Sequence, residues 1–203
     1  MTEKEKFVFD TILARRSVRR FIADRQVEKW KIVKMLEAAM AAPSACNTQP
    51  WEFIVISETD SMNLLRNAML EQNRFNAPMA IITCANPTYI PWEGNGWMID
   101  CSVAVENMLI AATAMGLVSV WIGICHEDIL RETFGIPGHL NILGTVYFGY
   151  TDAKPAPGTR YAEDAVYWET YDPNRVRPAK KVVDYGSIKL NDLSVNPPAA
   201  WED

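Results

Sequence analysis

The densest group of functional side chains is the segment ARRSVRRF at residues 14–21, where four of six consecutive positions are arginine. This clustering is unusual in a chain with a formal net charge of -5, because neighbouring guanidinium groups repel one another. In an extended backbone Arg15, Ser17 and Arg19 project to one side, and the other two arginines to the opposite side. Guanidinium groups bind phosphate oxygens in pairs of hydrogen bonds, and a hydroxyl between them adds a donor. The segment therefore predicts a phosphate site, with a solvated basic surface at a helix end as the alternative.

A second candidate segment is APSACNTQPWEFIVI at residues 42–56, where a helix is expected to end at Pro43 and a polar loop leads into a strand. Its hydrogen-bonding side chains are Ser44, Asn47 and Gln49. The small side chain of Ala45 leaves room for a planar ring to approach the backbone. The alternative is a capping and turn segment, with Trp51 anchoring the start of the strand in the core.

These two segments need a scaffold, and the apolar periodicity predicts one that intermingles helices and strands. Helices are expected at residues 7–16, 27–42, 60–72, 98–115 and 127–134. Strands are expected at residues 52–57, 79–85, 117–124 and 141–150. The helix at 98–115 is apolar on most sides, which predicts a buried central helix in an α+β fold.

The last part of the chain differs from the rest in composition and in hydrophobic pattern. Six of the twelve prolines fall after Tyr150, and the apolar periodicity is lost there. The region still contains several large apolar side chains, among them Trp168 and Tyr171. Their number is too large for all of them to be exposed to water. We therefore expect a main domain at residues 1–165 and an extension at residues 166–203 that wraps a partner subunit.

Composition narrows the possible functions. The 203 residues are 49% hydrophobic and 22% charged, the balance of a globular protein. The net negative charge argues against nucleic-acid binding, and no apolar run reaches the roughly 18 residues of a membrane span. The charged start MTEKEKF lacks a signal-peptide core, which predicts a cytoplasmic protein. Two histidines and four cysteines without a CxxC pair predict neither a metal site nor disulfides, and Cys46 is interpreted as a small packed residue.

Taken together, the two candidate segments resemble motifs of the nitroreductase family, in about the same order and separation. The likeness continues in GLVSVWIG at residues 116–123, and in GYTDAKPAPGTR at residues 149–160, which is similar to a late basic loop of that family. It spans about residues 10 to 164. The resemblance implies a mixed, mostly antiparallel sheet around a buried central helix, and a homodimer with FMN held between the subunits.

The resemblance also implies roles for particular residues. The flavin phosphate would be held by Arg15, Arg19 and Arg160, and the ribityl chain or ring edge would be reached by Arg16 and Ser17. Four residues from the other subunit would lie against the ring: Pro43, Ser44, Ala45 and Asn47. The turn formed by Trp121, Ile122 and Gly123 would lie along the ring, with a backbone N–H near the flavin N5. Many relatives carry two basic residues in the late loop, whereas here Gly158 precedes a single arginine.

The implied activity is an oxidoreductase in which NAD(P)H reduces FMN and a small-molecule electron acceptor, such as a nitroaromatic or a quinone, then reoxidises it. The flavin performs the chemistry, so no catalytic side chain is expected. Candidates to line the substrate pocket are Tyr89, Trp92, Trp97 and Met98, with core packing as their alternative role. A dehalogenase and a non-catalytic flavin-binding protein remain alternatives. The dehalogenating branch carries hydroxyl residues at the N5 turn, and Trp-Ile-Gly there favours hydride transfer.

Overall fold

The computed structural model describes residues 1–87, 96–154 and 162–176, and the chain divides into two compact units, residues 1–158 and 159–203. The helices of the first unit are α1 (Glu3–Ala14), α2 (Lys29–Met40), α3 (Thr59–Ala68), α4 (Gly96–Ala114) and α5 (Glu127–Phe134). Its strands are β1 (Trp51–Ile56), β2 (Met79–Ala85), β3 (Val118–Ile122) and β4 (Asn141–Gly149). Short 3-10 helices are η1 (Ala45–Asn47), η2 (Glu71–Asn73) and, in the second unit, η4 (Glu163–Ala165). The predicted α+β class is confirmed.

The four strands form one sheet in the order β1-β2-β4-β3, and every neighbouring pair is antiparallel. Parallel pairing enters at the β3 edge, where an isolated bridge joins Ser17 to Ser119. The predicted antiparallel character of the sheet is therefore confirmed, and the one parallel pairing among the described residues is this isolated bridge outside the named strands. A register shift between Thr83 and Cys84 pairs Thr83 with Gly144 but Cys84 with Ile142, so Leu143 has no partner on β2.

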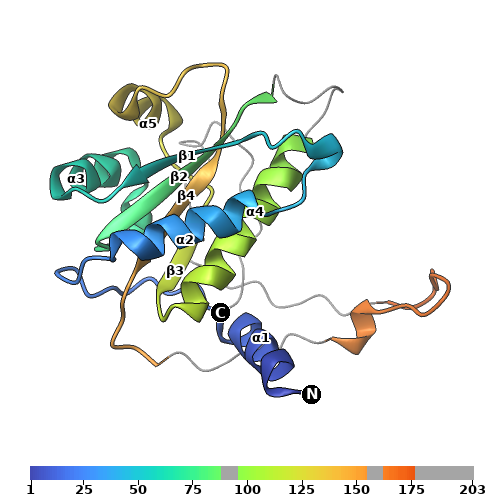
Figure 1. The fold of residues 1–203 in the computed structure, drawn as a ribbon. Coiled ribbons are helices and arrows are strands. Elements are labelled where there is room, and N and C mark those ends of the chain that lie inside the picture. The colour runs from blue at the N-terminus through green and yellow to red at the C-terminus, as the bar shows by residue number, and fades with distance from the viewer. Residues whose placement is uncertain (88–95, 155–161, 177–203) are drawn as a thin grey trace. The chain divides into compact units, whose positions relative to one another are not determined.

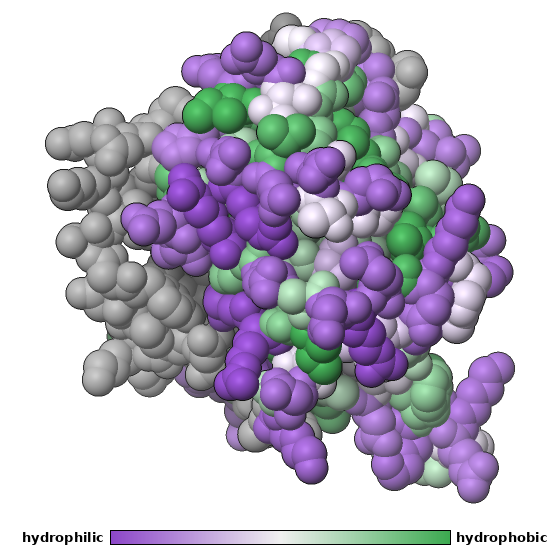
Figure 2. All heavy atoms as spheres, turned by 90° about the vertical axis from the view of Figure 1, so that its left-hand side faces the viewer, coloured by the Kyte–Doolittle hydropathy of each residue, from purple (hydrophilic) through white to green (hydrophobic). Residues whose placement is uncertain are grey.

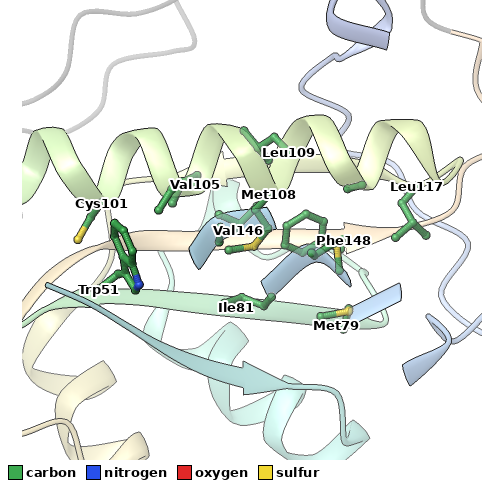
Figure 3. Packing of buried hydrophobic residues seen from close by; sticks show 14 of the residues in the cluster. Trp51, Met79, Ile81, Cys101, Val105, Met108, Leu109, Leu117, Val146 and Phe148 are labelled. Carbon is green, nitrogen blue, oxygen red and sulfur yellow. The ribbon is translucent and has the colours of Figure 1, made fainter. Parts of the chain in front are cut away.

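The sheet is covered on both faces, as the fully buried strand β2 requires. Met79 and Ile81 of β2 belong to the cluster formed with α2 and α4 (Figures 1 and 3). Ala80 and Ile82 belong to a second cluster with α3 and α5 on the opposite face. Because successive strand residues point to opposite faces, this continuous apolar run fits a strand buried between two helical layers.

Helix α4 lies across the first of these clusters, with Val105, Met108 and Leu109 among its buried residues (Figure 3). Ile99 and Val103 on the same helix stay exposed, at 68% and 36%. The structure thus packs α4 against one face of the sheet, and the described residues leave apolar side chains on its other side exposed. Within the described residues, α4 alone is long and apolar enough to cross a membrane, a property shared by the core helices of globular domains.

Helices α1 and α3 differ most from their predicted bounds. Helix α1 begins at Glu3, earlier than predicted, because Thr2 and Glu5 form a capping box. It ends at Ala14, since Arg15 already has extended backbone angles. Helix α3 ends at Ala68 instead of near residue 72, and the chain then turns to bury Met69, which is fully inaccessible.

Helix α1 has no buried residues in this chain, although it contacts α4. Its exposed apolar side chains are Phe7, Val8, Phe9, Ile12 and Leu13. By contrast, the face of the molecule that carries α3 and α5 is largely hydrophilic, with small apolar patches (Figure 2). A helix of about 12 residues is marginal in water without tertiary packing, so α1 calls for a further contact surface.

In the second unit, the described residues 162–176 fold on themselves around a tyrosine pair. The rings of Tyr167 and Tyr171 lie 4.5 Å apart between centroids. Arg175 stacks over the Tyr167 ring and donates hydrogen bonds to the carbonyls of Val166 and Glu163, both at 2.6 Å. Trp168 remains 78% exposed. Packing of residues 166–203 on a partner stays a prediction, and residues 177–203 lie outside the described part of the chain.

Candidate functional site

The arginine segment leaves α1 as an extended stretch along the open edge of β3. The Val18 N–H donates to the Ser119 carbonyl at 2.9 Å, beside the bridge between Ser17 and Ser119. Val18 is 6% exposed, whereas Ser17 and Arg19 on either side are exposed. This alternation is what an extended segment with one buried face requires, and it leaves a hydroxyl and a guanidinium group accessible on the other face.

The remaining arginines have different surroundings. Arg15 is partly buried, and its Nε lies 3.3 Å from Oε1 of Glu106 on α4. Arg20 forms an exposed and longer ion pair with Asp152, at 3.7 Å. Arg16 is partly buried. Acidic residues thus balance part of the positive charge at the two ends of the cluster.

The turn at Trp121, Ile122 and Gly123 follows directly from this edge. Trp121 is two residues beyond Ser119, so the pairing of Ser17 with Ser119 brings the arginine segment next to the strand that ends in this turn. Trp121 and Ile122 are partly buried, and Gly123 is exposed. Two segments about 100 residues apart in the sequence therefore meet at one sheet edge.

The loop between α2 and β1 has an unusual backbone. Cys46, Asn47 and Gln49 have φ values of 50°, 56° and 47°, a left-handed region that L side chains rarely adopt. Each such residue costs about 1–3 kcal/mol unless surrounding contacts enforce it. Within the loop, the Gln49 N–H donates to Ser44 Oγ at 3.0 Å, and Gln49 Nε2 donates to Asn47 Oδ1 at 2.9 Å. Pro43 is exposed at the start of this loop.

The loop is attached to the core by Asp100, a residue that sequence reasoning missed. Both carboxylate oxygens of Asp100 accept from the Ala45 N–H, at 3.2 and 3.3 Å, and the residue is only 6% exposed. The available signal was a lone acidic residue in the apolar first half of α4. Its partner could not be inferred, because 55 positions separate the two residues.

Cys46 does not have the surroundings that were expected. Within this chain it is exposed, so the interpretation as a packed residue is wrong here: the left-handed backbone turns the residue outward. The other three thiols are covered to different degrees, and all four cysteines are free. Burial raises the pKa of Cys84 and of Cys125 to about 11 and that of Cys101 to about 12.

The two candidate segments reach α4 at different sides. Arg15 contacts Glu106, and Ala45 contacts Asp100, six positions earlier. At 1.5 Å and 100° per residue, these positions lie about 9 Å apart along the axis and about 120° apart around it. One chain therefore directs its arginine segment and its polar loop to different faces of the same helix.

The predicted substrate-lining residues are only partly described. Trp97 is partly buried against the cluster between α4 and the sheet, which fits its alternative packing role. Met98 is 43% exposed on the uncovered side of α4. Tyr89, Trp92 and Arg160 lie outside the described residues. Among those that are described, no group of three or more His, Cys, Asp or Glu side chains is placed to hold a metal ion.

Comparison with known proteins decides the family. The nitroreductase family model matches residues 12–95 and 91–150, which include the arginine segment, the polar loop and the turn after β3. The chain belongs to the nitroreductase family. Its fold class and the sequence resemblance are thereby both confirmed.

Similar proteins carry oxidoreductase names. A protein of Archaeoglobus fulgidus, provisionally named NADH dehydrogenase/NAD(P)H nitroreductase, is 40% identical over 68% of this chain and 82% of its own length. A solved structure of the same provisional name from Parabacteroides distasonis has a TM-score of 0.73 at 32% identity, covering 81% of this chain and 98% of that one. A protein from Desulfovibrio desulfuricans, provisionally named nitroreductase and solved in complex with FMN, has a TM-score of 0.71 at 25% identity, covering 81% of this chain and 98% of that one.

A second group of relatives carries a different name. Iodotyrosine deiodinase 1 of Sus scrofa is 33% identical over 109 residues, which are 54% of this chain and 33% of that protein. The family membership therefore supports an oxidoreductase. The names of the relatives include both nitroreductases and deiodinases, so they do not decide the electron acceptor.

Proposed function

We propose that this protein is an FMN-dependent oxidoreductase that takes electrons from NAD(P)H and passes them to a flat acceptor such as a nitroaromatic or a quinone. The observation that carries the proposal is the pairing of Ser17 with Ser119, which puts the arginine segment beside the strand leading to the Trp121 turn. The arginine side chains, which suit the phosphate of a flavin nucleotide, then lie along the same sheet edge as the backbone groups of Trp121, Ile122 and Gly123, which suit its ring.

The residues at this edge fit that cofactor. Ser17 and Arg19 are exposed on the side of the segment away from the buried Val18, and Arg15 adds a partly buried guanidinium group. Their donors suit phosphate oxygens, and the cluster's mutual repulsion is relieved when an anion binds. The FMN complex of the related structure from Desulfovibrio desulfuricans supports the same choice of cofactor.

In this proposal the bound flavin supplies the hydride chemistry, and the chain's own residues bind and orient. Arg15 and Arg19 would hold the phosphate, while Arg16 and Ser17 would reach the ribityl chain or ring edge; a phosphate contact from Arg160, which lies outside the described residues, stays a prediction from the sequence. Backbone groups of the Trp121 turn fix the ring and offer an N–H where charge develops during transfer. NAD(P)H and the acceptor would bind in turn at the same face of the flavin, which predicts ping-pong kinetics.

The second half of the site comes from another copy of the chain. Within one chain the polar loop and the arginine segment reach different faces of α4, about 120° apart. The exposed apolar side chains of α1 and α4, including Phe7 and Ile99, supply a surface for such a partner. Pro43, Ser44, Ala45 and Asn47 of each subunit would then cover the ring bound by the other.

The visible spectrum of the purified protein tests the cofactor. We expect flavin absorbance that bleaches when NADH or NADPH is added without oxygen. The double variant Arg15→Ala with Arg19→Ala should lose FMN and remain dimeric, whereas Arg20→Ala, which removes an exposed arginine paired with Asp152, should keep it. A colourless protein that refuses added FMN at micromolar concentration would contradict the proposal.

Reductive dehalogenation is the second candidate, favoured by the deiodinase relatives. It shares the flavin site and differs in the acceptor. Anaerobic product analysis with the reduced protein separates the two: nitroaromatics should be consumed and halogenated phenols left intact. Release of halide at a rate comparable to nitro reduction would assign the second activity instead.

A further inference from the structure

Gly144 of β4 lies where a side chain cannot be accommodated. A Cβ built on it would meet the Ile122 carbonyl oxygen at 2.6 Å, Trp121 Nε1 at 2.8 Å and Gly123 Cα at 3.2 Å. These three nearest atoms belong to the last two residues of β3, Trp121 and Ile122, and to Gly123, which follows the strand. The φ value of +152° adds a backbone conformation that L side chains rarely adopt.

The surrounding strands explain how this close approach arises. The register shift opposite Thr83 leaves Leu143 unpaired on β2, and such a bulge redirects the strand locally. Gly144 follows the bulge, and the next residue, Thr145, pairs with Ile122 at the end of β3. The irregularity of β4 is therefore located beside the last residues of β3.

The Trp121 indole rests against this glycine. Its Nε1 is buried and has no hydrogen-bond partner among the described residues. A Trp N–H normally finds a partner when buried. Here no hydrogen bond among the described residues holds the ring, and the absence of a side chain at residue 144 leaves the space that the indole edge occupies.

We propose that Gly144 is a positioning residue for the flavin ring. Because it has no side chain, Trp121 can pack beside it, and this packing fixes the position of the Trp121–Ile122–Gly123 segment relative to the ring. This inference rests on the proposed function, because it assumes that the turn adjoins the flavin. A side chain at residue 144 must displace the Ile122 carbonyl, which belongs to the backbone and cannot rotate away. The phosphate end of the site, at Arg15 and Arg19, is not touched.

The test compares Gly144→Ala with Gly138→Ala, a glycine whose added Cβ would meet nothing within 4 Å. Both variants should purify as flavin-loaded protein, because the phosphate contacts at Arg15 and Arg19 are unchanged, and Gly138→Ala should keep wild-type FMN affinity. Reduction of the flavin by saturating NADH should slow about tenfold or more in Gly144→Ala, since a displacement near 1 Å costs up to about a hundredfold. Its flavin absorption band should also shift, and Gly138→Ala should match wild type in rate and spectrum.

A second variant keeps the inference testable if Gly144→Ala does not fold. Trp121→Phe removes Nε1, the atom that lies 2.8 Å from the position of an added Cβ at residue 144, and leaves the phosphate contacts at Arg15 and Arg19 in place, so it should still bind FMN but slow its reduction. Combined with it, Gly144→Ala should cost less than in the wild-type background, because one of its clashes is gone.

The outcomes separate the two proposals. A colourless wild-type protein overturns the proposed function and this inference with it. A yellow wild type with unchanged reduction rate in Trp121→Phe, or in a folded Gly144→Ala, overturns the positioning role alone. Additive effects of the two substitutions would also overturn it.

Discussion

Arg15 and Glu106 form an ion pair, with Nε 3.3 Å from Oε1, that links the end of α1 to the middle of α4. Burial raises the pKa of the Glu106 carboxyl above its ordinary value, and the neighbouring Arg15 acts in the opposite direction. Glu106 is thus an internal anion that occupies one of the arginines proposed to hold the flavin phosphate.

Glu106→Gln should therefore tighten FMN binding, because the phosphate no longer competes with a carboxylate for Arg15. Partly exposed ion pairs contribute about 0.2–1 kcal/mol, so we expect a gain of up to about fivefold in affinity. Quenching of flavin fluorescence during titration of apoprotein measures it. Glu132→Gln, at an exposed position on α5, is the matched control and should not change the affinity.

The same pair predicts a pH dependence. A carboxyl with a raised pKa takes up its proton as the pH falls through that value, so wild-type Glu106 becomes neutral at a pH above its ordinary 4.5. The affinity ratio between Glu106→Gln and wild type should then fall toward one on acidification. Protonation of the FMN phosphate affects both proteins and cancels in the ratio. A ratio independent of pH would exclude Glu106 as the competing anion.

Cysteine reactivity tests whether the polar loop covers the flavin ring. Cys46 is exposed, whereas burial raises the pKa of Cys84, Cys101 and Cys125 to about 11, 12 and 11. Only the thiolate reacts, so at about pH 8 one thiol per chain should be modified in the native protein and four after unfolding. Saturating FMN should slow modification of Cys46 if the loop covers the flavin ring. Equal rates with and without FMN would place the loop away from the ring.

Tyr150 joins α2 to the end of β4. Its hydroxyl donates to Glu28 and accepts from Lys31 Nζ at 2.7 Å, and Lys31 also donates to the Met115 carbonyl at the end of α4. The pKa of Glu28 is lowered, mainly by the hydrogen bond from Tyr150. A lowered carboxyl pKa gives stability that is present above the unfolded-state pKa and lost as the pH falls through the folded-state value.

Tyr150→Phe should therefore be less stable than wild type at neutral pH, and the difference should shrink as the pH falls below 4.5. Urea unfolding of both proteins at several pH values measures this difference in the free energy of unfolding. Tyr147→Phe is the matched control: the Tyr147 hydroxyl is buried with no partner among the described residues, so its removal should be neutral or stabilising. A constant deficit for Tyr150→Phe across this range would contradict the assignment to Glu28.

The local parts of this structure could be predicted from the sequence. The apolar run at residues 79–85 became β2 with unchanged bounds, because a strand buried on both faces has a continuous signature. The start of α1 was also encoded, since Thr2 and Glu5 have the spacing of a capping box, but the prediction did not use this signal and placed the start at residue 7. The end of α3 was not, because burial of Met69 depends on the tertiary fold.

The candidate site also has parts that could be predicted from the sequence and parts that could not. The arginine cluster and the polar loop were visible as anomalies of residue type and spacing. Their supports were not visible, because they join residues distant in sequence: Ser17 with Ser119, Ala45 with Asp100, and Gly144 with Trp121. No periodicity encodes such pairs. The outward position of Cys46 was missed because consecutive left-handed residues have no reliable sequence signal without glycine.

Small residues set the distance between α2 and α4, which is the basis of the last prediction. Ala39 of α2 is fully buried in one cluster with Ala104 of α4, and Asn107 Nδ2 of α4 donates to the Ala38 carbonyl at 3.1 Å. Ala39→Leu should overpack this contact and lower the free energy of unfolding by about 1–3 kcal/mol, measured by urea denaturation.

The same substitution at Ala114, exposed at the end of α4, should have little effect on stability. Because Asp100 of α4 holds the polar loop at Ala45, displacement of α4 by Ala39→Leu should also weaken FMN binding, whereas the Ala114 variant should bind FMN like wild type. Loss of stability with unchanged FMN affinity would show that α4 does not position the polar loop for flavin binding.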